Sequence, residues 1–410
     1  MAPHRSAVAA PCQNILMPVP RLRIPPGLLL ALALALELLL GAAAARANLP
    51  APIDAVPGMP PVVDPTNLYG EAAAGHLSPV VAKALPRIYV PNRISDDVYV
   101  IDPTTLKVVE RFKVGINPQH VVPSWDLKTL WVTNNGHPGR MDGSLTPIDP
   151  FTGKPGPEVK VEDPYNMYFS PDGRSAIVVV ENRERLDFRD PHSMSLQWTL
   201  WAPQCPGINH GDFAIDGRYA IFSCEFKGGR VKIDLTRRRV VGDLKLSRGG
   251  MPQDVRISPD GKVFYVADMH ADGVFLIDGA SFREMGFIPT GLGAHGLYPS
   301  RDGSKLYVSD RGTHEMDGRP RGKGDVAVID FATNKVVAVW PIPGGGSPDM
   351  GNVSADGRTL WLSGRFDNVV YAFDTTTGHV AEIPVGKEPH GLTVWPQPGR
   401  YSLGHTGNMR

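Results

Sequence analysis

The sequence predicts an all-β protein: a seven-bladed β-propeller with four-stranded blades, whose ring is closed by the C-terminal strand. Three observations lead to this prediction. A cassette of strand, tight turn and strand recurs with a period of about 40 to 50 residues, which is typical of propeller blades. The chain is rich in the turn formers Gly (44 residues) and Pro (40 residues). The strand that opens each repeat occurs for the last time at the C-terminus, without the strands that should follow it.

The repeating cassette is clearest at residues 251–268. Apolar residues alternate in a first strand that ends at the turn Pro259-Asp260-Gly261, where Asp bonds backbone amides and Gly supplies a positive φ. The β-branched and aromatic run Phe264–Val266 predicts a second strand, and Val274–Asp278 predicts a third. The Asp-Gly turns are therefore predicted to be structural.

The first strand of each repeat is predicted to line a central channel. Seven similar tripeptides mark where these strands begin: Pro118-Gln119-His120, Pro164-Tyr165-Asn166, Ile208-Asn209-His210, Pro252-Gln253-Asp254, Ala294-His295-Gly296, Pro348-Asp349-Met350 and Pro389-His390-Gly391. We call the face on which they lie the upper face. The Asp-Gly turns are predicted to lie on the opposite, lower face.

The closure of the ring follows from where the series of repeats begins and ends, because it begins at a second strand and ends at a first strand. The first unit begins at its second strand, Ile88–Val90, and the seventh first strand, His390–Trp395, comes at the C-terminus. The C-terminal strand is predicted to complete the N-terminal blade, which removes exposed sheet edges. The propeller then spans residues 85–400, with a tail at 401–410 and a Pro- and Ala-rich segment at 48–84 that lies on the domain or stays mobile. An open β-solenoid is the competing architecture, and the phase offset argues against it.

The N-terminus has the pattern of a secretory signal peptide. Arg21 and Arg23 precede the apolar run Leu28–Leu40, and small residues ending in Ala45-Arg46-Ala47 follow. The signal peptide is predicted at residues 1–47, with cleavage after Ala47. The apolar run is short for a stable membrane span, which needs about 20 residues. An uncleaved N-terminal anchor is the alternative.

Export implies an oxidising compartment, so the protein is predicted to be periplasmic or extracellular. Met17 gives a more ordinary signal peptide and is the predicted true start. Cys205 and Cys224 remain after cleavage, since Cys12 lies in the leader. The blade register places both near the same end of one blade, where they are expected to form a disulfide. Two free buried thiols are one alternative, and a Cys ligand beside His210 is another.

The repeats also resemble a known family. Tyr89-Val90-Pro91-Asn92, Trp131-Val132-Thr133-Asn134 and the Ser-Pro-Asp-Gly turns at 170–173 and 258–261 are similar to the YVTN family of β-propeller repeat proteins. More distantly, such proteins resemble the propeller domain of the haem-binding nitrite reductases and the propeller lactonases and lyases. The resemblance covers nearly all of the mature chain. It implies the fold strongly and the chemistry weakly, because the family's repeat is mostly structural.

Composition and motifs exclude several function classes. Lys+Arg and Asp+Glu are both 42, so the whole-chain charge gives no indication of nucleic-acid binding. A covalent c-type haem is excluded, because the chain has no Cys-x-x-Cys-His motif. The sequence also has no phosphate-binding loop, nucleotide fingerprint or Gly-x-Ser-x-Gly nucleophile elbow.

Each first strand begins with a residue capable of ligand binding or proton transfer near the mouth of the channel. These residues are His120, Asn166, His210, Asp254, His295, Asp349 and His390. His295 and Asp349 stand seven residues before their turn Asp, whereas the first four stand six before theirs, so the two groups are predicted to point differently. Ordinary bonding to backbone amides and water is the alternative role for each of them.

The loops between second and third strands add further candidates on the upper face. His270, Arg311 and Arg365 are the ones expected to contribute to ligand binding. Arg311 belongs to the long loop from Asp310 to Gly324, and long loops on one face of a repeat fold often carry a binding site. A solvated charged loop is the alternative.

The predicted function is a binding module that acts through the His- and Asp-lined upper face. One alternative is a lactonase-like, lyase-like or redox enzyme at the same face, with either a divalent transition metal held by His210, His295 and His390 or a noncovalent haem-type cofactor. A structural envelope or surface-layer protein is another alternative. The expected partner is a small molecule or a protein, not a nucleic acid, and the chain is expected to be a monomer. The sequence assigns no catalytic residue.

Overall fold

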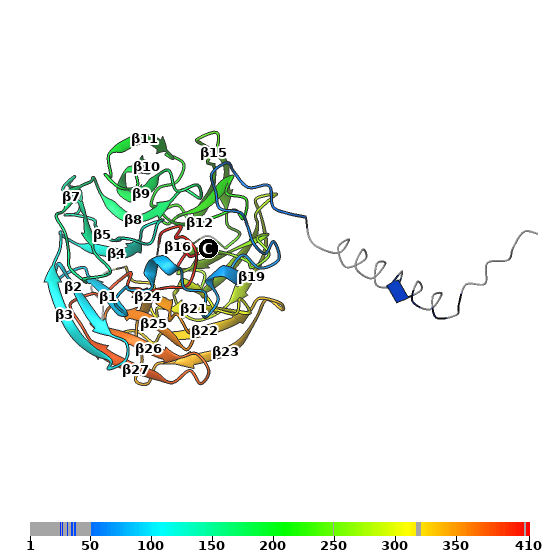
Figure 1. Cartoon of the computed structure of the whole chain (residues 1–410). Helices are drawn as coiled ribbons and strands as arrows, with labels where there is room; N and C mark the ends of the chain where they lie inside the picture. Colours follow the sequence, from blue (N-terminus) through cyan, green and yellow to red (C-terminus); the bar gives the residue numbers. More distant parts are fainter. Residues whose placement is uncertain are drawn as a thin grey trace, which may run out of the picture. The chain divides into compact units, whose positions relative to one another are not determined.

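The chain folds into seven four-stranded antiparallel sheets around a central channel, as the computed structural model shows (Figure 1). The structure describes residues 51–248, 250–316, 321–405 and 407–410, and six positions nearer the N-terminus, Pro25, Gly27, Ala31, Leu34, Ala35 and Glu37. The predicted signal peptide, with Met17 and the cleavage after Ala47, otherwise lies outside the described residues. Residues 52–410 form one compact unit. Among the described residues, no helix is long and apolar enough to cross a membrane.

The strands take the order that the repeats predict. The innermost strands are β28 (Thr393–Trp395), β4 (Pro118–Pro123), β8 (Pro164–Phe169), β12 (Ile208–Phe213), β16 (Pro252–Ile257), β20 (Ala294–Pro299) and β24 (Pro348–Val353). The second strands are β1 (Arg87–Asn92), β5 (Leu130–Asn134), β9 (Ala176–Val180), β13 (Tyr219–Cys224), β17 (Val263–Asp268), β21 (Lys305–Asp310) and β25 (Thr359–Gly364).

The two outer strands of each blade complete the sheets. The third strands are β2 (Asp97–Asp102), β6 (Ser144–Ile148), β10 (Arg185–Arg189), β14 (Gly229–Asp234), β18 (Gly273–Asp278), β22 (Asp325–Asp330) and β26 (Val369–Asp374). The outermost strands are β3 (Lys107–Lys113), β7 (Val159–Lys160), β11 (Leu196–Trp201), β15 (Arg239–Lys245), β19 (Arg283–Pro289), β23 (Lys335–Pro341) and β27 (Val380–Pro384). Short 3-10 helices lie at η1 (Gly70–Ala72), η2 (Pro79–Val81) and η3 (Glu181–Arg183).

The C-terminal strand closes the ring. β28 pairs with β1, with Ile88 opposite Val394 and Tyr89 opposite Thr393. The predicted closure is therefore confirmed, and the N-terminal blade has the order β28-β1-β2-β3. Because β28 takes the innermost place in this blade, β1 is paired on both sides and is no longer an edge strand.

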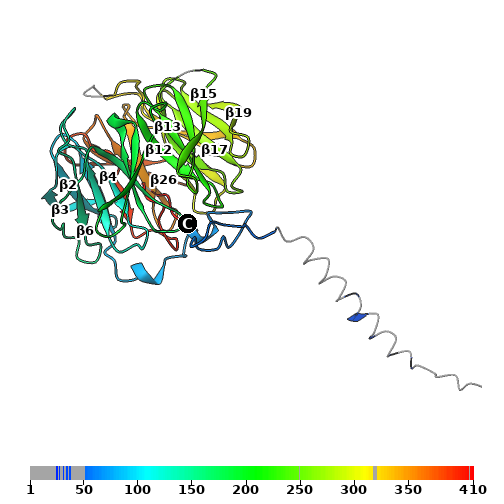
Figure 2. The same cartoon turned by 90° about the horizontal axis from the view of Figure 1, so that it is seen from above.

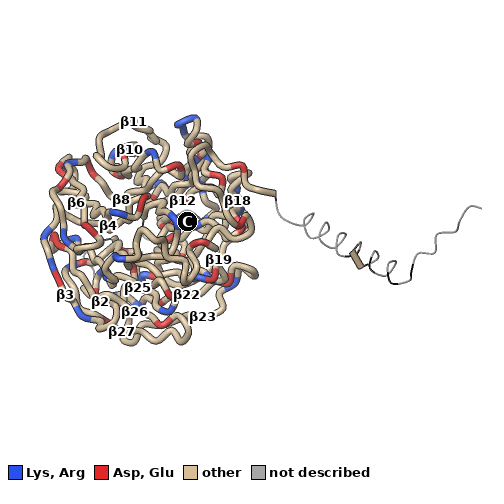
Figure 3. Tube along the Cα trace, in the orientation of Figure 1, with Lys and Arg blue, Asp and Glu red and all other residues tan. Residues whose placement is uncertain are grey.

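Apolar side chains pack between neighbouring blades, where they form the core. Tyr265 of one blade, for example, packs with Leu297 and Ile329 of the next. The outermost strands alternate between exposed and half-buried residues, as β15 does along Arg239–Lys245. Lys and Arg are interspersed with Asp and Glu around the blades (Figure 3).

The Ser-Pro-Asp-Gly turn at 258–261 is held together by its own side chains. Ser258 donates its hydroxyl to Asp260 at 2.6 Å and accepts the amide of Val263 at 2.9 Å. Gly261 has a φ of +72°, in the left-handed region that favours glycine. The polar groups of this turn are used within it, which agrees with a structural role.

The lower end of the channel is covered by two segments that flank the propeller in sequence. Residues 52–86 lie across the lower-face turns, where Leu68 donates its amide to Pro259 O at 2.8 Å and Tyr69 donates its hydroxyl to Ile257 O at 2.6 Å. The C-terminal residues lie on the same side as this segment (Figure 2). Residues 401–410, predicted as a tail beyond the propeller, are buried: Tyr401, Leu403 and Met409 are at most 3% exposed.

The tail is fixed by backbone pairing with an inner strand. Phe169 of β8 donates its amide to Leu403 O at 3.0 Å, and His405 donates its amide to Met167 O at 2.8 Å. A Cβ on Gly404 would lie 2.4 Å from the Cα of Tyr168, so only glycine permits this approach. The pairing carries the side chain of His405 into the channel.

A disulfide joins Cys205 and Cys224 in the fourth blade, with their Cα atoms 4.7 Å apart. Replacing both with Ser is expected to lower the free energy of unfolding by about 3 kcal/mol, because the bridge restricts the unfolded chain. Urea denaturation of the double variant and the wild type measures the difference. A reducing agent should produce a similar loss in the wild type and none in the variant. Equal stability of the oxidised and reduced wild type would contradict the prediction.

Candidate functional site

A bulge near the start of each long inner strand shapes the channel. In β4, Pro118 pairs with Asn134 and His120 already pairs with Thr133, so β4 has one extra residue. β8, β12, β16, β20 and β24 show the same shift. A bulge re-aims the neighbouring side chains. In β4, β8 and β16, the residues at the second and third positions therefore both reach the channel instead of alternating between two faces.

The bulges create two levels of side chains. The second positions form the upper level, nearer the mouth: Gln119, Tyr165, Asn209, Gln253, His295, Asp349 and His390. The third positions form the lower level: His120, Asn166, His210, Asp254, Gly296, Met350 and Gly391. This accounts for the two spacings in the sequence, because the residues seven before the turn Asp belong to the upper level. His390, which follows Pro389, belongs there too.

Asp349 organises the upper level. Its carboxylate accepts Arg311 Nη2 at 2.7 Å and His390 Nδ1 at 2.7 Å, and His295 Nδ1 lies 3.0 Å away. Burial alone would raise the pKa of Asp349, but Arg311, His295 and His390 hold it well below its usual range. Asp349 is therefore an anion that orients three neighbours.

The two upper imidazoles are neutral bases. Burial, reinforced by Arg311, lowers the pKa of His295 to about 4. Burial also places the pKa of His390 well below its ordinary value, although Asp349 opposes the shift. Because His390 donates through Nδ1 to Asp349, its Nε2 carries the lone pair, and this atom has no hydrogen-bond partner among the described residues.

A cavity of about 180 Å³ opens above this level. Its walls differ in charge: Arg311, Arg365 and His295 lie on one side, and Glu181 and Glu225 on the other. Burial raises the pKa of Glu181 well above its ordinary range, and the charge of Glu225 adds to the effect. The two carboxyl groups are therefore expected to share a proton at neutral pH.

Three histidines meet at the lower level. The ring centroids of His120 and His210 are 5.5 Å apart, those of His120 and His405 are 5.2 Å apart, and those of His210 and His405 are 4.8 Å apart. In the described part of the chain, these three residues form the one set whose potential metal-ligand atoms all lie within 4.8 Å of one another. Burial lowers the pKa of each imidazole well below its ordinary value, so all three are neutral.

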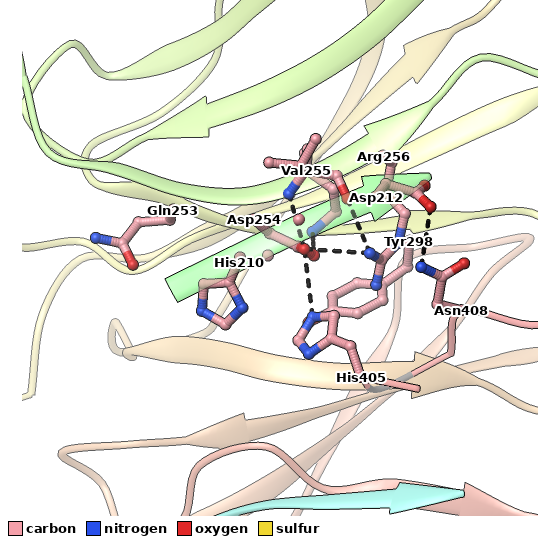
Figure 4. A network of polar contacts seen from close by, with 12 residues as sticks. His210, Asp212, Gln253, Asp254, Val255, Arg256, Tyr298, His405 and Asn408 are labelled. Atoms are coloured by element: carbon pink, nitrogen blue, oxygen red, sulfur yellow. Dashed lines mark hydrogen bonds and ion pairs between the residues drawn. The ribbon is translucent and has the colours of Figure 1, made fainter. Parts of the chain in front are cut away.

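Asn166, Tyr165 and Asp254 surround this cluster. Asn166 Nδ2 lies 3.2 Å from His210 Nδ1 and 2.9 Å from His405 Nδ1. On the far sides of the rings, Tyr165 Oη lies 3.2 Å from His210 Nε2, and Asp254 Oδ1 lies 3.3 Å from His405 Nε2. Figure 4 shows the contact between His405 and Asp254 beside His210.

The structure brings most of the predicted site residues together, but not all. Nine of the ten expected ligand-binding residues lie in or beside the channel, the exception being His270. His270 is exposed and contacts the ring of His314, outside the residues that line the cavity. Of the expected metal set, His210 belongs to the cluster in which the ligand atoms converge, whereas His295 and His390 lie one level higher.

His405 is the residue that sequence reasoning missed. It lies outside the repeats, so no register places it near the channel. The apolar residues Tyr401, Leu403 and Met409 are the available signal, because a solvated tail seldom carries three of them within nine residues. Gly404, directly before His405, is a second signal, because glycine allows two backbone segments to approach closely.

Fold and site together define a seven-bladed β-propeller whose hub holds a cluster of buried histidines beneath an open polar cavity. Residues 43–397 match the family described as YNCE-like beta-propeller, so the chain belongs to this family. No match to a curated protein is found.

Solved structures with the same fold include proteins of different activities. Hydrazine synthase of Kuenenia stuttgartiensis is 21% identical with a TM-score of 0.56, over 68% of this chain and 91% of that one. Dihydro-heme d1 dehydrogenase NirN is 17% identical with a TM-score of 0.56, over 75% of each chain. A Bacteroides uniformis protein provisionally assigned as a 6-phosphogluconolactonase is 15% identical with a TM-score of 0.58, over 75% of this chain and 98% of that one. At these identities the similarity establishes the fold alone.

Proposed function

We propose that the protein is a binding module for a small polar acid, a carboxylate that also carries hydroxyl or amino groups. The observation that carries the proposal is the cavity with opposed walls above a closed channel floor. The carboxylate of the ligand would face Arg311 and His295. Its hydrogen-bond donors would face the Glu181–Glu225 pair.

The chemistry of Arg311 supports an anionic group on the ligand. Its side chain is 2% exposed, and one terminal nitrogen is bonded to Asp349. Its Nε has no hydrogen-bond partner among the described residues. A buried guanidinium gains most from a carboxylate that accepts its remaining N–H groups.

The acidic wall supports hydrogen-bond donors on the same ligand. Glu225 accepts the amides of Asn209 at 2.7 Å and Gln253 at 3.0 Å, which fixes its position. Glu181 Oε1 is buried without a hydrogen-bond partner among the described residues. A hydroxyl or ammonium group next to this pair would supply the missing bond.

The size of the cavity supports a small ligand. Its volume of about 180 Å³ is below the range of roughly 300 to 1,000 Å³ that drug-sized ligands occupy. It corresponds to about six water molecules, at roughly 30 Å³ each. A small organic acid fits this volume better than a haem-type cofactor.

Calorimetric titration with a panel of small hydroxy acids, amino acids, unsubstituted carboxylates and lactones tests the proposal. At least one substituted acid is expected to bind, and Arg311→Gln is expected to weaken it by more than about 10-fold, because a charge-assisted hydrogen bond is lost. Arg140→Gln is the matched control, since Arg140 is exposed and does not line the cavity. Thermal unfolding shows whether the Arg311 variant is folded. Absence of binding by every panel member, or unchanged binding in a folded Arg311→Gln protein, would contradict the proposal.

Acid–base catalysis on the bound acid is the second candidate function. It is favoured by the Asp349–His390 pair, in which the carboxylate holds the imidazole at 2.7 Å with its basic Nε2 directed away. Such a pair can accept a proton from a bound molecule. The same panel, followed for turnover, distinguishes an enzyme from a binding module.

A further inference from the structure

The lower level of the channel contains a buried donor set that the proposed acid-binding function does not use. His120, His210 and His405 come from β4, from β12 and from the C-terminal tail, so three distant segments supply one nitrogen-rich cluster. Each of the three side chains is fully buried. Neutral imidazoles are typical ligands for zinc, copper and other late transition metals.

His120 is the first independent sign that the cluster binds a ligand. Both of its ring nitrogens are buried without a hydrogen-bond partner among the described residues. A buried polar side chain usually has at least one partner, so two orphan nitrogens on one ring require an explanation. The ring lies directly against Gly391, where any Cβ would fall 1.9 Å from Nδ1. Gly391 therefore leaves space for this imidazole, whose two nitrogens have no hydrogen-bond partner among the described residues.

The groups around His210 and His405 are the second sign. The Tyr165 hydroxyl is hydrogen-bonded to Nε2 of His210 at 3.2 Å, and the Asp254 carboxylate lies 3.3 Å from Nε2 of His405. Both Nδ1 atoms face the same point, which the Asn166 amide nitrogen occupies. The surroundings of His210 match those of metal-binding histidines, in which an outer hydrogen bond fixes the tautomer and turns the other nitrogen toward the ion.

We propose that His120, His210 and His405 bind one divalent transition metal ion of the zinc class in the hub of the propeller. The ligand atoms lie within 4.8 Å of one another, and a tetrahedral zinc site needs separations of about 3.4 Å. Metal binding would therefore draw the three rings together and move the Asn166 amide from between the two Nδ1 atoms.

The third ligand makes the site dependent on the C-terminal tail. His405 has a positive φ of 49°, and the backbone on either side is anchored to β8 and by Asn408 to Asp212 at 3.0 Å. Metal binding therefore fastens the tail in the channel, and docking of the tail completes the site. An ion that binds only the docked state stabilises that state by mass action.

Titration of the chelator-treated full chain with Co²⁺ and Zn²⁺ tests the proposal. One ion per chain is expected, with the absorption bands of nitrogen-coordinated Co²⁺, and bound metal should raise the unfolding midpoint. His405→Gln is expected to weaken binding by more than about 100-fold, since loss of a direct ligand exceeds the effect of losing an outer partner. It should also abolish the metal-dependent rise in midpoint. The glutamine keeps the side chain polar and near its original size.

The control is the double variant His270→Ala, His314→Ala. These two exposed histidines have ring centroids 5.4 Å apart and offer a surface site for an added ion. The control is expected to bind Co²⁺ as the wild type does. If His405→Gln is not folded, His120→Gln replaces it in the test. Absence of metal binding at micromolar concentrations, or binding lost in the surface variant and kept in the hub variant, would overturn the proposal. Neither result depends on whether an organic acid binds above.

Discussion

Deletion of residues 401–410 is expected to lower the free energy of unfolding by about 5 kcal/mol. Tyr401, Leu403 and Met409 are at most 3% exposed, and full burial of such side chains contributes roughly 1.5 to 3 kcal/mol each. The deletion also removes Arg410, whose Nη2 lies 2.9 Å from the buried Asp212 carboxylate. Urea denaturation followed by circular dichroism measures the change.

A chain of the same length, with residues 401–410 replaced by Gly and Ser, is the control for the tail deletion. It keeps the chain length and lacks the apolar side chains, so it should be as unstable as the deletion. His405→Gln in the intact tail should retain most of the stability, because it leaves the three apolar residues in place. Wild-type stability in the Gly/Ser chain would show that the tail does not pack as described.

Asp349→Asn is expected to lower the free energy of unfolding by about 3 to 5 kcal/mol at neutral pH, because breaking a buried ion pair leaves an uncompensated charge. Arg311 would lose its carboxylate partner at 2.7 Å, and His390 would lose the acceptor that fixes its ring. Asparagine has nearly the same shape as aspartate, so the effect isolates the charge. Asp356→Asn, in an exposed lower-face turn, is the control and should change stability by less than about 1 kcal/mol.

The effect of Asp349→Asn should depend on pH in a defined direction. The folded-state pKa of Asp349 lies well below the ordinary value of 3.8, despite burial, because Arg311 and the two imidazoles stabilise the anion. The folded anion therefore contributes stability that is complete above pH 3.8 and is lost as the pH falls toward the folded pKa. The difference between wild type and variant should shrink in that acidic range. A difference that stays constant down to low pH would show that charge is not the cause.

The fold was predictable because the same strand-turn-strand motif recurs along the sequence, once in nearly every blade. The turn at 258–261 and its copies set the period, and a tight turn forms from local contacts alone. Closure by β28 was predictable from the missing strands at each end of the series, since an unpaired edge is unfavourable. Nothing beyond local pattern and the counting of strands was needed.

The candidate site was predictable only in part. His120, His210 and Asp254 were found because they recur at one position of the repeat. The two levels were not found, because a bulge adds a residue by tertiary pairing and leaves no local signal. The different spacing of His295 and Asp349 from their turn Asp is a consequence of the bulge. Spacing alone does not show which residues belong to the upper level of the channel.

His405 shows the other limit of sequence reasoning. Its position depends on how the tail packs against β8 and Asp212, which are more than 190 residues away in sequence. Apolar residues in a terminal segment indicate that the segment is buried. They do not indicate which strand it packs against. The contact between Arg410 and Asp212 has the same character, since neither residue belongs to a recognisable motif.

The position of β28 has a consequence for the synthesis of the protein. A ribosome delivers the N-terminal residues first, so the six blades from β4 to β27 are complete in sequence before His390 and His405 exist. Until β28 emerges, β1 remains an open edge at which a second chain is able to pair. A nascent chain therefore completes its hub last, and a product terminated before residue 390 would lack His390, His405 and the inner strand of the N-terminal blade.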